Sequence, residues 1–356
     1  MAEKLHDLKQ NKMTFEARGL VTGTKSQKFY RSGTTKSGNA FNEINFGLTI
    51  APQKTIYVKL TGFVQESVYY YGKANKDDKK GQSIKVAWKD RKKSPAENFR
   101  LIGVNISVDR DGDNNVNEVM VPYDAVEYLH KSLKDGESYF VRGEVKPSSF
   151  TNNEGNVIRK VELILNQMSY TNSPVDFDAE DFEPKADIIV DPFVFASINK
   201  ETDEDDKPTG RYILQGYDIG YNSIELMNFI VEASDEGLAK KLKKRMKPGY
   251  SMKMFGEISV VHDIVEEEED DDDWGVQRKS KKNVVKSRSR FEYVLFDVDG
   301  KTFDAEEYSE DGIAKAMKAI KNAKTAEAKF ADKDEEENEQ EWGFDEDDDD
   351  SDPWDW

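Results

Sequence analysis

Two stretches of 17 residues share one pattern in this chain, and this repeat constrains the fold more than any other feature. Leu129–Val145 aligns without gaps to Leu242–Ile258, 113 positions further along the chain. In each copy, apolar residues four positions apart predict a short helix with one buried stripe, and a strand follows. A glycine after a helix suits a turn with positive φ, and a glycine inside a strand indicates a bend or bulge. The glycines at these places are Gly136 and Gly143 in the first copy and Gly249 and Gly256 in the second.

The segments around the two copies also correspond. In both halves, three strand-like stretches precede the helix, and one more follows the repeated strand. Three strands, a helix and two strands is the order of the OB-fold, a five-stranded barrel that binds oligonucleotides. The stretches are Thr14–Thr24, Ala40–Ile50, Thr55–Val64 and Lys160–Leu165 in the first half, and Ile188–Ile198, Arg211–Tyr221, Glu225–Ala233 and Arg290–Leu295 in the second.

The predicted fold class is therefore mainly β, with two tandem OB-fold-like five-stranded barrels that each place a helix between strands 3 and 4. A C-terminal helix is predicted at about 311–330, where Ile313, Met317 and Ile320 have helical spacing. The alternative is two unrelated α+β domains that match by chance at one helix and strand. The predicted segments are an N-terminal arm (1–12), the first barrel (13–171), an acidic linker (172–185), the second barrel (186–300) with a charged insertion (265–290), a hairpin and helix (301–330), and a disordered acidic tail (331–356).

The charge is distributed very unevenly along the chain. The formal net charge is −19, but residues 332–356 hold 15 acidic residues against one lysine, and Glu266–Asp273 is an unbroken acidic run. Residues 1–100 hold 20 Lys or Arg against 9 Asp or Glu. Acidic runs of this kind are typical of disordered interaction tails, and basic clusters are typical of proteins that bind polyanions.

The acidic tail ends in aromatic rings, as Asp352-Pro353-Trp354-Asp355-Trp356. A tail that only improves solubility needs no aromatic tip, although such a tail is the simpler alternative. The tip resembles that of bacterial and phage single-stranded DNA-binding proteins, whose acidic tails end in proline and an aromatic residue, usually phenylalanine. That resemblance implies that Trp354, Asp355 and Trp356 recruit partner proteins of DNA replication and recombination.

Aromatic residues alternate with cations in two parts of the first barrel. Binding of single strands without sequence preference requires cations for the phosphates and exposed rings on which bases stack. One group lies in a loop rich in Gly, Ser, Thr and Lys, and the other follows the third strand, where consecutive tyrosines cannot all face one core. The predicted nucleic-acid-binding residues are Lys25, Lys28, Phe29, Tyr30, Arg31, Lys36, Tyr69, Tyr70, Tyr71, Lys73, Lys76, Lys85, Trp88, Lys89 and Arg91.

Other aromatic residues are weaker candidates. Phe41 lies on the second strand, and Phe46 and Tyr57 are predicted to lie in the core. In the second barrel, tyrosines line a strand with few cations nearby. We interpret that barrel as a secondary DNA contact or as an interaction domain.

The sequence does not predict an enzyme, a metal site or a cofactor. There are no cysteines, and the three histidines stand in no metal-binding or catalytic spacing. Asp109–Asn117 resembles the start of a calcium loop, but Asn114 replaces the required glycine, so a hairpin turn is favoured. Because no apolar run approaches ~20 residues and no signal peptide is evident, we expect a cytoplasmic protein, in a bacterium or in the host of a phage.

Together these observations predict sequence-independent binding and protection of single-stranded DNA, with no membrane association. One alternative is a protein-interaction scaffold or virion component with OB-like barrels and solubilising acidic segments. A second is an inhibitor that mimics DNA, although such mimics place acids on a folded surface, whereas these acids lie in low-complexity runs. The oligomeric state is left open.

Overall fold

A computed structural model of the chain describes residues 4–35, 37–73, 81–111, 114–151, 157–171, 173–203, 205–267, 284–323 and 325. The protein is mainly β, as predicted, and a helix at residues 310–323 confirms the predicted C-terminal helix. Among the described residues, no helix has the length and apolar character needed to cross a bilayer.

Five strands of the first half close into a ring, called the first ring below. Counted along the chain, its first three strands pair antiparallel in order. The third strand pairs parallel with the fifth, the fifth pairs with the fourth, and the fourth pairs with the first, which closes the ring. Helix α1 (Pro122–Ser132) precedes the fourth strand, and Pro122 starts it at a position where a missing N–H costs nothing. In pairing order the strands are β1 (Lys12–Thr22), β3 (Ala40–Ala51), β4 (Lys54–Phe63), β11 (Val157–Tyr170) and β10 (Ser138–Thr151).

The second half repeats this pattern of pairing in a second ring. Its third and fifth strands again form the parallel pair, and its fourth strand again returns to its first. Helix α2 (Glu236–Arg245), after the short 3-10 turn η2 (Ala233–Asp235), precedes the fourth strand. In pairing order the strands are β12 (Lys185–Thr202), β13 (Pro208–Ile219), β14 (Ile224–Val231), β16 (Val284–Asp304) and β15 (Ser251–Glu267).

The glycines of the repeat have the same roles in both rings. Gly136 and Gly249 have φ of 85° and 88° in the turn between helix and strand, a conformation that L side chains rarely adopt. The strand register shifts at Gly143 and at Gly256, which confirms the predicted bulges. A Cβ at Gly143 would lie 1.9 Å from the Ile164 carbonyl oxygen, and one at Gly256 would lie 2.1 Å from that of Val294.

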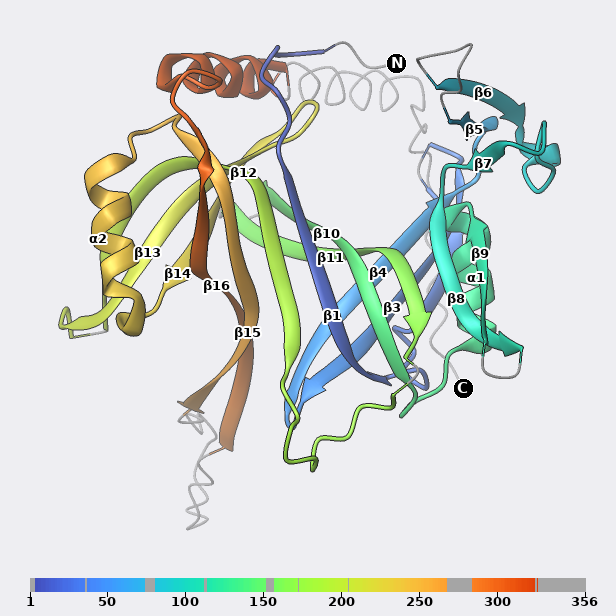
Figure 1. Cartoon of the computed structure of the whole chain (residues 1–356), viewed down its shortest axis with the longest axis horizontal. Coiled ribbons are helices and arrows are strands. Elements are labelled where there is room, and N and C mark those ends of the chain that lie inside the picture. The colour runs from blue at the N-terminus through green and yellow to red at the C-terminus, as the bar shows by residue number, and fades with distance from the viewer. Residues whose placement is uncertain are drawn as a thin grey trace, which may run out of the picture.

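The two rings are joined edge to edge. Strand β1 pairs antiparallel with β12 from Lys12 to Arg18, so both rings belong to one 13-stranded sheet. One cluster of buried apolar side chains extends through both rings, from Phe15 in β1 to Leu295 in β16. Figure 1 shows the rings side by side, with β1 and β12 between them and the helices α1 and α2 on opposite outer flanks. The rings therefore share a strand junction and a core.

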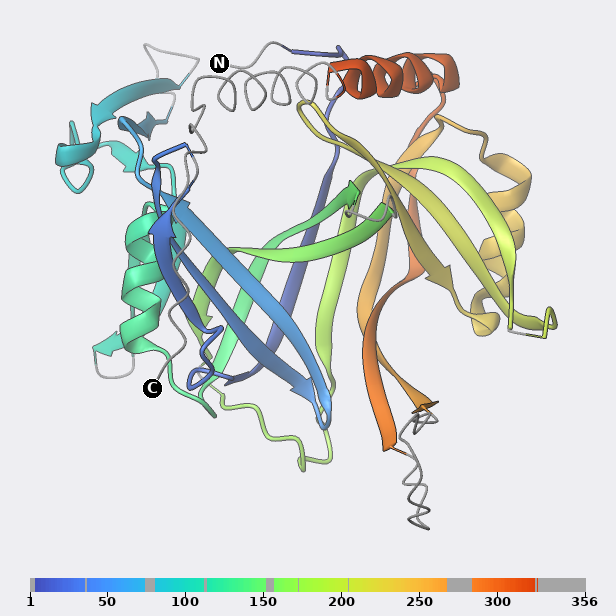
Figure 2. The same ribbon diagram turned by 180° about the vertical axis from the view of Figure 1, so that it is seen from behind.

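The first ring has three additions that lack a counterpart in the described part of the second. Strand β2 (Tyr30–Thr34) extends the sheet beyond β3, and β8 (Val104–Asp111) and β9 (Asn114–Met120) form the predicted hairpin. A small separate sheet follows β4, where the sequence predicted a loop (Figure 2). This accessory sheet consists of β5 (Ser67–Gly72), β6 (Gln82–Ala87) and β7 (Phe99–Leu101), with a 3-10 turn, η1 (Trp88–Asp90), between the last two.

The chain's N-terminal arm packs on the second ring although it leads into the first. Leu5 and Leu8 contact a buried cluster that includes Ile313 and Ile320 of the C-terminal helix. The Asn11 side chain donates to the Tyr217 carbonyl at 2.8 Å and accepts from the Ile219 N–H at 2.6 Å. The arm and the C-terminal helix thus lie together over one end of the second ring.

Candidate functional site

The outer faces of β3 and β4 form the floor of the candidate site. On β4, Ile56, Val58 and Leu60 point inward and are buried, so the residues between them point outward. These include Tyr57, whose residue is 58% exposed, and Lys59. The prediction that Tyr57 belongs to the core is wrong, whereas Phe46 is buried as predicted.

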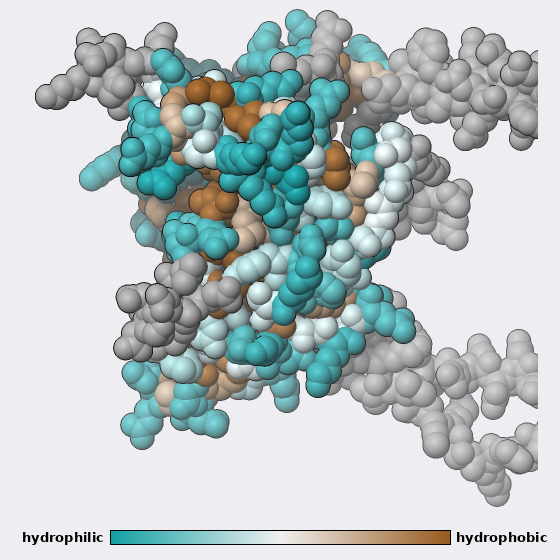
Figure 3. Space-filling view, turned by 90° about the vertical axis from the view of Figure 1, so that its right-hand side faces the viewer, coloured by the Kyte–Doolittle hydropathy of each residue, from teal (hydrophilic) through white to brown (hydrophobic). Residues whose placement is uncertain are grey.

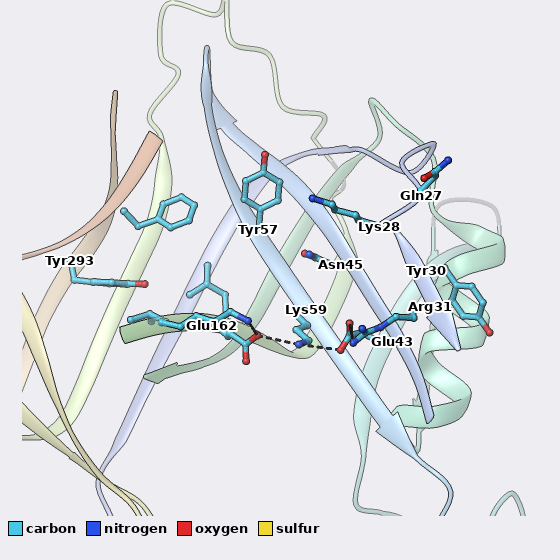
Figure 4. Close-up of a pocket in the computed structure, with 14 residues that line it drawn as sticks. Gln27, Lys28, Tyr30, Arg31, Glu43, Asn45, Tyr57, Lys59, Glu162 and Tyr293 are labelled. Atoms are coloured by element: carbon cyan, nitrogen blue, oxygen red, sulfur yellow. Dashed lines mark hydrogen bonds and ion pairs between the residues drawn. The ribbon is translucent and has the colours of Figure 1, made fainter. Parts of the chain in front are cut away.

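A chain of ion pairs crosses this floor (Figure 4). The Lys59 ammonium lies 3.0 Å from Glu43 and 3.1 Å from Glu162 of β11. Arg31 of β2 lies 2.9 Å from Glu43, and Lys160 lies 2.6 Å from Glu162. Two carboxylates therefore pair with three cations, and the set keeps an excess of positive charge.

The ion pairs keep these groups charged. Burial would raise the pKa of Glu43, but hydrogen bonds from Lys59 and Thr61 and the nearby cations outweigh it, so this pKa lies below its ordinary value. Burial likewise opposes the lowered pKa of Glu162, which accepts hydrogen bonds from Lys160 and Lys59. The pKa of Lys59 is raised, because its two carboxylate partners outweigh the effect of burial.

A groove of about 490 Å³ lies above this floor. Phe291 and Tyr293 of β16 form its opposite wall, so the groove needs both rings. The Tyr57 ring meets the Phe291 ring edge to face, with 6.5 Å between centroids. Figure 4 shows Tyr57 and Lys28 standing beside each other above the ion pairs. An aromatic ring beside cations in an open groove can stack on a flat ligand that carries negative charge.

Only some of the residues predicted in the loop rich in Gly, Ser, Thr and Lys, at Lys25–Asn39, line the groove. Lys28 and Arg31 line the groove together with Tyr30. The Tyr30 ring is stacked on His130 of α1 at 4.0 Å, which covers one of its faces. Phe29 is only 4% exposed and belongs to the core, so the prediction that its ring receives a base is wrong. Lys25 is exposed outside the groove lining.

The second predicted group lies on the accessory sheet, away from the groove lining. Strand alternation exposes Tyr69 and Tyr71, at 47% and 43%, and buries Tyr70 at 4%. Burial removes Tyr70 as a stacking platform, so that prediction is wrong, and its hydroxyl donates to the Arg91 carbonyl at 2.7 Å. Lys73, Lys85 and Lys89 are exposed.

Arg91 and Trp88 have structural contacts. The Arg91 guanidinium makes two hydrogen bonds to Asp124 of α1, at 2.8 and 2.9 Å, and lies 4.4 Å from the centre of the Trp88 ring. The pKa of Arg91 is raised mainly by the hydrogen bond to Asp124. This pairing ties the accessory sheet to α1, so Arg91 is not available as a phosphate ligand in this conformation, and its predicted role is corrected.

Several predicted residues lie outside the described part of the chain: Lys36, Lys76, Trp354, Asp355 and Trp356. The same holds for most of the charged insertion and for the acidic tail. Within the described residues, no group of three or more His, Asp or Glu side chains is arranged to hold a metal ion.

The sequence contained a signal for the residues that the prediction missed. In Ile56-Tyr57-Val58-Lys59-Leu60, strict alternation puts Tyr57 in the same phase as Lys59, facing outward. Nothing local indicated Phe291, since it reaches the groove from the second ring.

Comparisons with known proteins give one family. A protein-family model described as YorF matches residues 16–333, which is most of the chain. No curated protein matches the sequence.

Solved structures of the single-stranded DNA-binding protein from Thermus aquaticus are similar at 8% identity and a TM-score of 0.36. The wild-type structure covers 82% of this chain and 93% of its own, and a deletion mutant covers 82% and 94%. A TM-score this low does not establish a shared fold.

Proposed function

We propose that this chain, which belongs to the YorF family, binds single-stranded DNA without sequence preference in the groove between β4 and β16. The observation that carries the proposal is Tyr57, an exposed ring that faces Phe291 and stands in one groove with Lys28, Arg31, Lys59 and Lys160. Proteins that coat single strands combine these two elements, a basic groove and rings on which successive bases stack.

The preference for single strands over duplex follows from the rings. A base can stack on Tyr57 or Phe291 only when its own face is free, and bases inside a duplex already stack on each other. Every base presents such a face, so stacking does not distinguish sequences. The cations supply the remaining affinity through release of counterions from the phosphates, which makes binding sensitive to salt.

We further propose that both rings are OB-fold barrels, at about residues 13–171 and 186–300. The closed pairing order and the helix before the fourth strand support this assignment. OB-folds bind oligonucleotides on the face of strands 2 and 3, and β3 and β4 hold these positions in the first ring. The groove therefore lies where the proposed fold would place a ligand.

The tail completes the proposal. Its acidic run and aromatic tip favour recruitment of replication or recombination proteins in the cytosol, while the first ring supplies most of the groove that holds the DNA. This role is supported by the sequence alone, through the resemblance of the tip to single-stranded DNA-binding proteins.

The test is a fluorescence-anisotropy titration of a labelled oligo-dT at low and moderate salt, with a duplex of equal length beside it. We expect salt-sensitive binding to the single strand and much weaker binding to the duplex. Replacing Tyr57 with Ala should weaken binding by about 1–3 kcal/mol. The matched control is Tyr221→Ala, an equally large ring that is 47% exposed outside the groove lining.

Absence of single-strand binding by the parent protein would overturn the proposal and would favour a protein-interaction scaffold. Equal losses for Tyr57→Ala and Tyr221→Ala would remove the groove as the site. Both variants change exposed side chains, and a thermal melt of each confirms that the fold is retained.

A further inference from the structure

The accessory sheet presents an exposed apolar hollow. Its inner side packs Val68 and Tyr70 against Val121, with Trp88 and Leu101 alongside. Its junction with the end of β4 encloses a hollow of about 300 Å³ that is lined by Phe63, Tyr69, Trp88 and Ile102. Phe63 is 43% exposed and Ile102 is 59% exposed, so apolar side chains face water here.

The space-filling view from this side shows the same contrast. Hydrophobic residues gather in the upper part of the face, where the accessory sheet lies, and hydrophilic residues surround them (Figure 3). Exposed apolar surface with a polar rim marks a binding site more often than a purely structural surface.

The surroundings of the hollow are basic. The described residues of this segment, 66–73 and 81–102, contain seven Lys or Arg against three Asp or Glu. Lys85 stands directly across from Tyr69 in the strand pair, and Arg100 stands directly across from Tyr71, so each exposed ring has a cation beside it. This charge favours an anionic ligand, and the rings favour a flat one.

A line of side chains leads from the groove to the hollow. Arg31 lies at the groove and also 5.4 Å from the centre of the Phe41 ring, which is 6.1 Å from the ring of Phe63. On β4, Tyr57, Lys59, Thr61 and Phe63 alternate along the outer face. Tyr57 and Phe63 are six residues apart, about 20 Å along a strand at ~3.3 Å per residue.

We propose that the hollow is a second subsite for the same single strand and receives a nucleobase from the part that leaves the groove over Phe63. Lys85 and Arg100 meet the neighbouring phosphates. About six stacked nucleotides at ~3.4 Å each span the distance from Tyr57, and fewer are needed if the strand is extended. The inference rests on the proposed function and adds a path along β4 and a minimum length of strand.

Two oligonucleotides of different length distinguish binding in the groove alone from binding in both the groove and the hollow. A dT strand of about two nucleotides is too short to fill both even when it is extended, and one of about twelve fills both. Ile102→Glu puts a negative charge in the hollow at a well-exposed position, where the fold tolerates it. Val119→Glu is the matched control, since Val119 is 40% exposed on β9 outside the hollow.

We expect Ile102→Glu to weaken binding of the longer strand by about tenfold and to leave the shorter strand unchanged. Val119→Glu should leave both unchanged. Equal affinity of parent and Ile102→Glu for the longer strand would overturn the inference.

Photocrosslinking with 5-iodouracil strands gives an independent readout, because it identifies the stacked rings. We expect crosslinks to Tyr69 or Trp88 only with the longer strand, in addition to Tyr57 or Phe291. Crosslinks confined to Tyr57 or Phe291 would overturn the second subsite and leave the groove intact. Absence of binding by the parent protein would instead overturn the proposed function.

Discussion

The two rings have the same strand pairings but different outer surfaces. In the first ring, the outer faces of β3 and β4 carry Tyr57, Lys59 and Glu43 around an open groove. On the corresponding strands of the second ring, Ile213 stands across from Ile230, and Gln215 donates to Asn228 at 3.0 Å. Inward-facing residues therefore maintain the ring, whereas outward-facing residues can differ between the rings and can form a site in one of them alone.

The cations on the two faces also have different surroundings. Arg211 of β13 lies 3.4 Å from Glu201 and 3.2 Å from Glu232, and it also pairs with the buried Glu292. Arg290 also lies 3.1 Å from Glu292, so three carboxylates share two cations. In the first ring, three cations share two carboxylates. The first face keeps positive charge for a ligand, and the second does not.

The largest expected effect tests whether the rings are built alike. Gly143→Ala and Gly256→Ala each put a Cβ against a backbone carbonyl at the bulge, so each should lower the free energy of unfolding by about 3 kcal/mol. Chemical denaturation measures this. Because the rings share β1–β12 pairing and one core, both variants should still unfold in one transition.

Gly237→Ala in α2 is the control for these variants, because no heavy atom lies within 4 Å of the added Cβ. It should be neutral or stabilising by up to ~1 kcal/mol. If one of the two bulge substitutions lowered the free energy of unfolding only slightly, the two rings would not be built alike at this position.

The second-largest expected effect concerns protein stability at the junction of the rings and leaves binding in the groove unchanged. Asp218 of β13 is half-buried, and burial raises its pKa to about 6, opposed by Lys146 and assisted by Glu225 and Glu144. Since the raised pKa favours the protonated form in the folded state, this contribution to stability is present below about pH 4 and is lost as the pH rises through about 6. Asp218→Asn should therefore raise the free energy of unfolding at pH 8 by about 2 kcal/mol, with little change at pH 4.

Denaturation curves of parent and Asp218→Asn across this pH range give the comparison. Affinity for oligo-dT should not change, because Asp218 lies outside the groove lining. A variant that is no more stable than the parent at pH 8 would show that water or a neighbouring cation already solvates this carboxylate.

The smallest effect concerns the charge difference between the faces. Glu43→Gln keeps a hydrogen-bond partner for Lys59 but removes a negative charge beside Lys59 and Arg31. Affinity for oligo-dT should rise by about threefold at low salt, and the gain should shrink as salt screens it. Glu201→Gln beside Arg211 is the matched control and should leave binding unchanged. An unchanged or lower affinity for Glu43→Gln would mean that phosphates do not approach Lys59.

Much of the fold was predictable because its signals are local. The repeat of helix, glycine and strand predicted α1, α2 and both bulges, since each depends on residues a few positions apart. The loop predicted after β4 is instead a three-stranded sheet, because β6 and β7 pair with β5 across long connections that leave no local pattern.

The candidate site was predicted only in part for a similar reason. Residue type correctly selected Lys28, Arg31 and Tyr69 as accessible, but it could not distinguish Tyr70 from its neighbours until the phase of β5 was fixed. Phe29 had no helical or strand pattern around it, and it is buried because α1 and the first ring cover it.

Local sequence patterns were enough to predict α1, α2, the two bulges and the core strands of both rings, because these follow from backbone sterics and from side chains close in the chain. Tertiary packing instead determines the pairing of β1 with β12, the wall that Phe291 forms opposite Tyr57, and the place of the accessory sheet at the end of β4. These contacts join segments far apart in sequence, and which of several apolar edges meet is set by the packing of the whole core.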